Sequence, residues 1–131
     1  MKNQSAATKK LGIEGELFVI EYLKKLGFQI STTNFRKFFG EIDIIACKKN
    51  MYIFVEVKTR KSATMPMGNL ISLDKQKKII KTAQAFIVEH KIDSNTTYRF
   101  DVALVLKENS SFYLEYIENA FTQHNTQHDY Y

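Results

Sequence analysis

Apolar side chains recur along the chain with two periods, one typical of helices and the other of strands. Between residues 8 and 26 the apolar positions follow helical spacing, and Gly27 is a fitting stop. A second helix is predicted after Ser72, which can cap it, with an apolar stripe from Ile79 to Ile87. Runs rich in β-branched and aromatic residues predict five strands, at residues 28 to 36, 41 to 47, 51 to 60, 97 to 106 and 111 to 118.

The second and third strands flank the polar stretch KKN, which predicts a hairpin that turns at Lys49 and Asn50. Asn tolerates the positive φ that such turns require. A hairpin centred on this pair sets Asp43 opposite Glu56 and Glu41 opposite Lys58. The basic aromatic stretch RKFFG, residues 36 to 40, is predicted to form a loop before it.

The order helix, three strands, helix, two strands predicts an α/β fold with a central mixed β-sheet flanked by α-helices. The chain has 131 residues, 44% of them hydrophobic, which suits one domain over residues 1–131. Residues 1–8 and 122–131 are expected to be flexible ends, and residues 61 to 71, which hold the only proline, a loop. There is no signal-peptide pattern or long apolar run, so we expect a cytoplasmic protein that does not enter the membrane.

The formal net charge of +5 and the pI near 9.2 favour polyanionic partners through neutralisation of phosphates. Lysine-rich chains are also basic for reasons of solubility, so this charge permits nucleic-acid binding without establishing it. The single cysteine, Cys47, excludes an internal disulfide.

Two charged residues interrupt the otherwise apolar strand at 51 to 60. Because side chains alternate across a strand, Glu56 and Lys58 share a face with Phe54. In the predicted hairpin the β-carbons of Asp43 and Glu56 lie about 5 Å apart, and two such carboxylates weaken a sheet unless positive charge lies between them. A divalent cation such as Mg²⁺ would resolve this conflict, and Lys58 could orient or polarise an attacking water.

The same charges have a plainer interpretation as a salt-bridged sheet edge. Glu56 and Lys58 would then pair with each other, and Glu41 would complete a cross-strand ladder of alternating charge. Exposed pairs of this kind contribute about 0 to 1 kcal/mol each. The geometry of the hairpin alone leaves both interpretations open.

Asp43, followed after twelve residues by Glu56-Val57-Lys58, resembles the D-x(n)-E-x-K signature of the PD-(D/E)XK nuclease superfamily. The surrounding sequence resembles the small bacterial YraN-type family, which is endonuclease-like and similar to archaeal Holliday-junction resolvases. The matching stretches are GE at 15 and 16, NFRKFFGEIDIIA at 34 to 46, FVEVKTR at 54 to 60, Lys75, RFDV at 99 to 102 and IENAF at 117 to 121. The proline that names the superfamily is absent, since Ile42 precedes Asp43.

The resemblance implies a restriction-endonuclease-like fold and a phosphodiesterase site that depends on Mg²⁺ or Mn²⁺. It would make Asp43 and Glu56 metal ligands, Lys58 the catalytic lysine, and Glu16 a further acidic ligand or base. Glu16 lies beside the apolar stripe of its predicted helix and could face the sheet. Its alternative role is that of a solvated helix carboxylate.

Positive and aromatic side chains flank the acidic motif in the sequence, namely Arg36, Lys37, Arg60 and the phenylalanines at 35, 38 and 39. This combination suits contacts to nucleic-acid phosphates with stacking on an exposed base. Alternatively, at least two of the phenylalanines anchor the loop in the core. Lys75 belongs to a lysine-rich helix start that could follow a nucleic-acid backbone or remain a solvated face. Asp101, in an apolar strand, is expected to make structural hydrogen bonds.

Two functional hypotheses follow. The first is a Mg²⁺- or Mn²⁺-dependent DNA endonuclease, with branched DNA among its candidate substrates and a two-fold homodimer as the assembly that symmetric substrates would favour. The second is a module on the same fold that binds nucleic acid or recruits a partner without chemistry.

Overall fold

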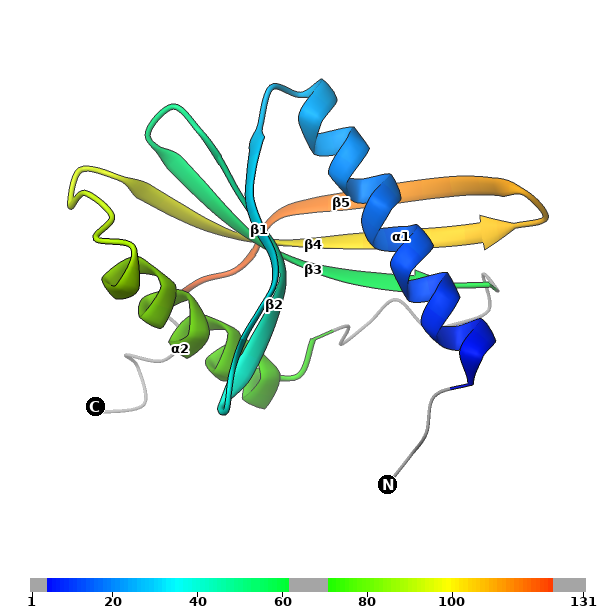
Figure 1. The fold of residues 1–131 in the computed structure, drawn as a ribbon, viewed down its shortest axis with the longest axis horizontal. Helices are drawn as coiled ribbons and strands as arrows, with labels where there is room; N and C mark the ends of the chain where they lie inside the picture. Colours follow the sequence, from blue (N-terminus) through cyan, green and yellow to red (C-terminus); the bar gives the residue numbers. More distant parts are fainter. Residues whose placement is uncertain (1–4, 62–70, 124–131) are drawn as a thin grey trace.

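The computed structural model describes residues 5–61 and 71–123, and Figure 1 shows the fold as a ribbon. Its elements in chain order are α1 (Ala6–Lys25), β1 (Gln29–Lys37), β2 (Gly40–Lys48), β3 (Met51–Arg60), α2 (Leu73–Glu89), β4 (Thr97–Glu108) and β5 (Ser111–Phe121). All seven predicted elements are present in the predicted order. Most of the predicted 61 to 71 loop, and residues 1–4 and 124–131 of the predicted flexible ends, lie outside the described residues.

The five strands form one sheet in the order β1-β2-β3-β4-β5. Neighbouring strands are antiparallel except β3 and β4, which are parallel and joined through α2. The predicted α/β fold with a mixed sheet and flanking helices is therefore confirmed. This arrangement is compatible with the restriction-endonuclease-like fold.

Each helix covers a different face of the twisted sheet (Figure 1). One core cluster joins α2 to the sheet, through Ile79, Ile80, Ala83 and Phe86 against residues that include Ile45, Phe54, Phe100 and Val102. The other joins α1 to the opposite face, through Val19 and Leu23 against residues that include Ile44, Val55, Ala103 and Val105. Neither helix of the described chain is long and apolar enough to cross a membrane.

Three local features differ from prediction. The first helix begins at Ala6, not residue 8, because the Ser5 side chain accepts a hydrogen bond from the Thr8 amide and caps it. Part of the N-terminal segment predicted to be flexible is therefore helical. At the tip of the β2–β3 hairpin, Lys49 rather than Asn50 takes the positive φ, 56°. The expected loop at 36 to 40 is a two-residue turn, since β1 runs to Lys37 and β2 starts at Gly40.

Two glycines allow close contact between the helices and the hairpin strands, one glycine for each helix. A Cβ atom at Gly15 of α1 would lie 1.9 Å from Oγ1 of Thr59, so α1 packs its backbone directly onto β3. A Cβ atom at Gly40 would lie 2.5 Å from Oγ1 of Thr82 and 3.0 Å from the Lys78 carbonyl oxygen, which sets β2 against α2. Both contacts are tighter than any larger residue allows without movement.

Candidate active site

The β2–β3 hairpin has the predicted register, from Lys48 opposite Met51 to Ile44 opposite Val55. Regular backbone pairing ends at Ile44 and Val55, so it does not extend to the predicted pairs of Asp43 with Glu56 and Glu41 with Lys58. Beyond that point the backbone amide of Val57 donates to Oδ2 of Asp43 at 2.8 Å. The Asp43 side chain thus reaches across to β3 where the ladder stops.

Burial and the negative charge of Glu56 both act on the ionisation of Asp43. Glu56 is only 6% exposed, and Asp43 is partly buried beside it. Burial, followed by the negative charge of Glu56, raises the pKa of Asp43 from 3.8 to about 7, although the hydrogen bond from Val57 opposes this rise. The sheet therefore holds two carboxylates close enough to repel each other, as the hairpin predicted.

Glu16 and Glu41 add to this negative field. Burial raises the pKa of Glu16, and the charges of Glu41 and Glu56 raise it further, while a 3.3 Å hydrogen bond from Nδ2 of Asn34 opposes the rise. Glu16 follows Gly15, whose contact with β3 fixes this part of α1. It is half-buried, so the expectation that it could face the sheet agrees with its surroundings.

Lys75 provides a positive charge in direct contact with the pair. Its Nζ atom lies 2.9 Å from Oε2 of Glu56. Burial lowers the pKa of Lys75, but the hydrogen bond and the negative charges of Glu56, Asp43 and Glu41 outweigh this effect and raise it. Sequence reasoning assigned Lys75 to nucleic-acid contacts, whereas the structure places its ammonium group on a buried carboxylate of the candidate site.

Lys58 has no hydrogen-bond or ion-pair partner among the residues that the structure describes. The alternating ladder of Glu56, Lys58 and Glu41 does not form, because Glu56 pairs with Lys75 and Glu41 with Arg36 at 2.8 Å. An ammonium group without a carboxylate partner, on a strand that carries an acidic pair, remains available to a ligand.

The other predicted nucleic-acid contacts are spread over several environments. Lys37 pairs with Glu89 of α2 and lies over the Phe35 ring, and Arg60 donates to the carbonyl of its neighbour Thr59 at 3.2 Å. Phe35 packs against the α2-side core, as the anchoring alternative predicted, but Phe38 is 98% exposed. Phe38 is therefore not one of the phenylalanines that anchor this segment.

Asp101 has the expected structural surroundings. Its buried carboxylate accepts hydrogen bonds from the Arg99 guanidinium, from the Tyr116 hydroxyl at 2.6 Å and from the backbone amide of Asn119 at 2.9 Å. Burial and the bond to Asp101 raise the pKa of Tyr116, which keeps the phenol protonated. These contacts join β4 to β5 and explain how the carboxylate tolerates burial.

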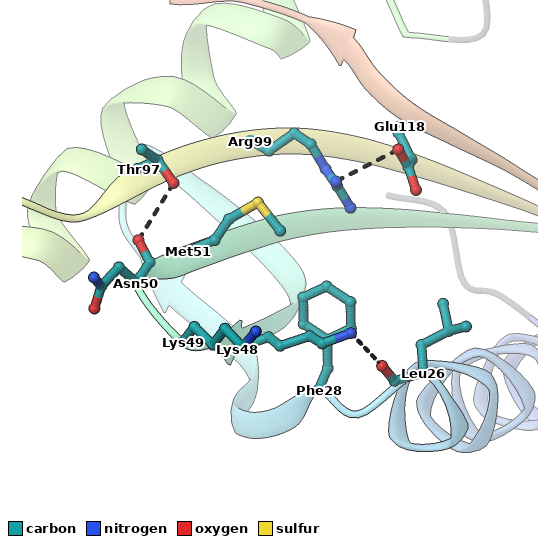
Figure 2. Close-up of a pocket in the computed structure, with 9 residues that line it drawn as sticks. All are labelled: Leu26, Phe28, Lys48, Lys49, Asn50, Met51, Thr97, Arg99 and Glu118. Atoms are coloured by element: carbon teal, nitrogen blue, oxygen red, sulfur yellow. Dashed lines mark hydrogen bonds and ion pairs between the residues drawn. The ribbon is translucent and has the colours of Figure 1, made fainter.

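A pocket at the other end of β3 is a weaker candidate for a site (Figure 2). It includes Lys48, Lys49 and Arg99, but two of its cations already have partners. Lys48 donates to the Leu26 carbonyl at 2.6 Å, and Arg99 pairs with Asp101 and with Glu118. This pocket lies between the end of α1 and the sheet, and its described lining contains no pair of carboxylates like Asp43 and Glu56.

The donor set of the candidate site fits a hard divalent cation. Its acidic groups are carboxylates, which are the ligands that hard divalent cations prefer. A bound cation would also relieve the like-charge repulsion between Asp43 and Glu56. Among the described residues no three His, Cys, Asp or Glu side chains are grouped to hold a metal. Asp43 and Glu56 are two carboxylates, the number that Mg²⁺ sites commonly take together with water and phosphate ligands.

Sequence reasoning missed two contributors. Glu41 was expected only to face Lys58, yet its charge acts on both Asp43 and Glu16. Asn34, which has a positive φ of 52°, holds the Glu16 carboxylate. Glu41 could have been found from its spacing, since it stands two residues before Asp43 on the same strand. No local pattern links Asn34 to a helix 18 residues earlier.

The fold and this site define an α/β protein in which a buried and a partly buried carboxylate of a mixed sheet lie beside a lysine of helix α2. The chain belongs to the UPF0102 family: residues 15–105 match the family described as "Uncharacterised protein family UPF0102". A UPF0102 protein of Clostridium botulinum strain Hall is 42% identical over 116 residues, which cover 86% of this chain and 94% of that relative. A UPF0102 protein of Clostridium acetobutylicum is 43% identical with the same coverage. The predicted family resemblance is confirmed at this level.

Proposed function

We propose that this protein is a metal-dependent nuclease of the PD-(D/E)XK superfamily, related to archaeal Holliday-junction resolvases, that hydrolyses phosphodiester bonds in DNA, including branched DNA. The observation that carries the proposal is the meeting of two carboxylates, Asp43 and Glu56, at the end of a sheet ladder with lysines beside them. Two carboxylates that repel each other in a partly buried position cost stability, and such pairs cluster at functional sites.

Each residue has a role that follows from its position. Asp43 and Glu56 would hold Mg²⁺ or Mn²⁺, which when bound supplies a Lewis acid for the phosphate and its attacking water. Glu16, whose carboxylate has a raised pKa, would accept a proton from water or add charge to the metal's surroundings. Lys58 would donate to the phosphoryl oxygen that gains negative charge.

Arg36, Lys37, Arg60 and Lys75 complete the proposal as groups that attract the phosphate backbone. Lys75 has a second role, because it neutralises Glu56. Symmetric substrates would favour a two-fold homodimer with one site for each strand.

A second candidate function is a module that binds nucleic acid or recruits a partner without cleavage. It is favoured by the Lys75–Glu56 pair, which neutralises a proposed ligand, and by the lack of a three-ligand cluster among the described residues. Under this candidate the acidic groups stabilise the local structure of a binding surface.

Purified protein incubated with linear, flapped and four-way DNA, with and without Mg²⁺ or Mn²⁺, tests both functions. The proposed nuclease cuts DNA only with metal, and Asp43→Asn, Glu56→Gln and Lys58→Ala each abolish cutting. Glu115→Gln removes an exposed carboxylate on β5 and serves as the matched control that keeps activity. Cleavage that survives all three site variants contradicts the proposed site, and binding without cleavage supports the module.

A further inference from the structure

Phe38 is the most exposed large apolar side chain of the described residues. It lies in the two-residue turn between β1 and β2 and is 98% exposed. An isolated exposed aromatic residue is ordinary, but this one is part of a larger surface feature. Phe38, Phe39, Asp74, Lys77, Lys78 and Lys81 together line one pocket, which we call the aromatic–lysine patch.

The backbone that carries Phe38 is held firmly. The flanking residues Lys37 and Gly40 pair across the turn, and Gly40 packs against Thr82 and the Lys78 carbonyl of α2. Because a Cβ atom at Gly40 would lie only 2.5 Å from Oγ1 of Thr82, the turn sits directly on the helix. Phe38 is therefore presented on a fixed support, which reduces the entropy lost when a ligand binds it.

Phe39 and Lys81 form the base of the patch. The rings of Phe38 and Phe39 meet edge to face, with centroids 5.0 Å apart and an interplanar angle of 80°. The Nζ atom of Lys81 lies 4.8 Å from the centroid of the half-buried Phe39 ring. Phe39 is thus covered on one side, whereas the faces of Phe38 remain open.

The charge around these rings is mainly positive. Lys77, Lys78 and Lys81 line the patch along one side of α2, and Asp74 is the acidic member among its described residues. Lys78 lies 3.6 Å from Asp74 in an exposed pair, and Lys81 adds a positive charge beside the rings. An open aromatic face surrounded by lysines fits a planar ligand attached to phosphates.

The patch and the candidate active site are built on the same two elements. Gly40 at the edge of the patch is followed by Glu41 and, three residues along β2, by Asp43, a distance of roughly 10 Å in a strand. On α2, Lys75 of the site and Lys77 and Lys78 of the patch lie within one turn of helix. One nucleic-acid strand can contact both.

We infer that the aromatic–lysine patch binds an unpaired nucleotide next to the phosphate that is cut, with its base stacked on Phe38. The inference rests on the proposed function for its substrate and narrows that substrate to DNA with unpaired bases, such as flaps, forks and open junctions. A base inside a duplex has both faces covered by its neighbours, so Phe38 can stack along an unpaired strand, whereas a blunt duplex offers it only the outer faces of its two end pairs.

A tryptophan at position 38 provides a direct probe, because the chain contains no other tryptophan. The Phe38→Trp variant is titrated in EDTA with oligo(dT), with a forked duplex and with a blunt duplex of equal length. We expect oligo(dT) and the fork to quench the tryptophan emission, and the blunt duplex to leave it largely unchanged.

The affinities of further variants for end-labelled DNA, measured by fluorescence anisotropy in EDTA, form the second arm. Phe38→Ala is expected to weaken binding to oligo(dT) and to the fork about tenfold and binding to the blunt duplex much less. Lys81→Gln is expected to weaken all three and to lower the salt dependence. Tyr113→Ala removes a 56% exposed aromatic on β5, at the opposite edge of the sheet, and is the matched control.

The two proposals fail in different ways. Quenching in Phe38→Trp and loss of affinity in Phe38→Ala, without cleavage of any DNA by the wild type, would overturn the nuclease and support the patch. Metal-dependent cleavage combined with unchanged binding by Phe38→Ala would overturn the patch alone. If Phe38→Ala instead converts a dimer to a monomer in sedimentation and leaves DNA affinity unchanged, the patch is a contact between two copies and the inference is wrong.

Discussion

The Nζ atom of Lys75 lies 2.9 Å from Oε2 of Glu56, and this contact joins the first turn of α2 to the buried strand β3. Glu56 is 6% exposed, and a buried carboxylate costs free energy unless it is paired with a cation. The same carboxylate oxygen is one that a metal ion would bind. Lys75 therefore stabilises the protein and, under the proposed function, would compete with the metal for Glu56.

Replacing Lys75 by Gln is expected to lower the free energy of unfolding by about 1 to 2 kcal/mol at pH 7.5 in EDTA. Breaking a fully buried ion pair lowers the free energy of unfolding by more than this. The loss is smaller here because Lys75 is partly exposed and water can reach its partner. Urea denaturation followed by circular dichroism measures the loss, and Mn²⁺ is expected to restore part of it. Lys78→Gln, which breaks the exposed pair with Asp74, is the control and is expected to cost under about 0.5 kcal/mol.

Asp43→Asn is expected to stabilise the metal-free protein at pH 8. The pKa of Asp43 is raised from 3.8 to about 7, so its ionisation favours the unfolded state. The stability that the protonated form provides is complete below pH 3.8 and is lost as the pH rises through about 7. Asn cannot ionise, and its side-chain oxygen can still accept the hydrogen bond from Val57. We expect a gain of about 1 to 3 kcal/mol at pH 8.

The pH dependence of that gain is the check. Urea denaturation of both proteins in EDTA at intervals from pH 8 to pH 4 is expected to show the difference shrinking toward pH 4, where wild-type Asp43 is protonated in the folded state. Asp101→Asn is the contrasting variant, because Asp101 already has Arg99 and Tyr116 as partners and its replacement is expected to destabilise. A stability difference for Asp43→Asn that does not change with pH contradicts the raised pKa.

The roles of Glu56 and Glu16 in metal binding can be separated. Mn²⁺ at about a hundred times its dissociation constant is expected to stabilise the wild type by about 2.7 kcal/mol, as for any ligand of the folded state alone. Glu56→Gln removes most of this gain, because Glu56 shares the site with Asp43. Glu16→Gln is expected to keep more than half, since Glu16 is held by Asn34 and acts on the pair through its charge. If Glu16→Gln and Glu56→Gln lose the same share of the stabilisation by Mn²⁺, Glu16 is instead a direct metal ligand.

The patterns predicted the architecture well because each helix buries one face and the central strands bury both. The helical spacing in α2 follows from burial of Ile79 and Phe86 in one core, and the continuous apolar run of β3 follows from burial of its residues in both cores. The hairpin register was also predictable, since Lys49 and Asn50 occupy the only polar stretch between two apolar strands. Those predictions depend on local patterns that the fold preserves.

The candidate site was predictable only where its residues are close in sequence. Asp43 and Glu56 follow from the hairpin, but the partner of Glu56 is Lys75, which lies on a helix beyond a long connection. Pairwise distances between elements depend on how the helices pack on the sheet, and that packing is set by Gly15 and Gly40. The sequence identifies both glycines but does not indicate which side chains they contact in the fold.

The contact between Gly15 and Thr59 fixes the position of Glu16 and provides the last prediction. Gly15→Ala places a Cβ atom 1.9 Å from Oγ1 of Thr59, so α1 must move away from β3. We expect a loss of about 1 to 3 kcal/mol in the free energy of unfolding. Gly12→Ala, in the same helix with no atom within 4 Å of the added Cβ, is the matched control and is expected to gain about 0.5 to 1 kcal/mol.

A second substitution distinguishes the steric clash from any other effect of Ala at position 15. Thr59→Ala removes the Oγ1 and Cγ2 atoms that the new Cβ meets but leaves the Thr59 Cβ position 3.0 Å away, so it should restore part of the stability lost in Gly15→Ala. If cleavage depends on Glu16, the double variant should also recover part of the activity. Additive losses in the double variant would show that α1 does not depend on this contact, and that Glu16 is positioned by Asn34 alone.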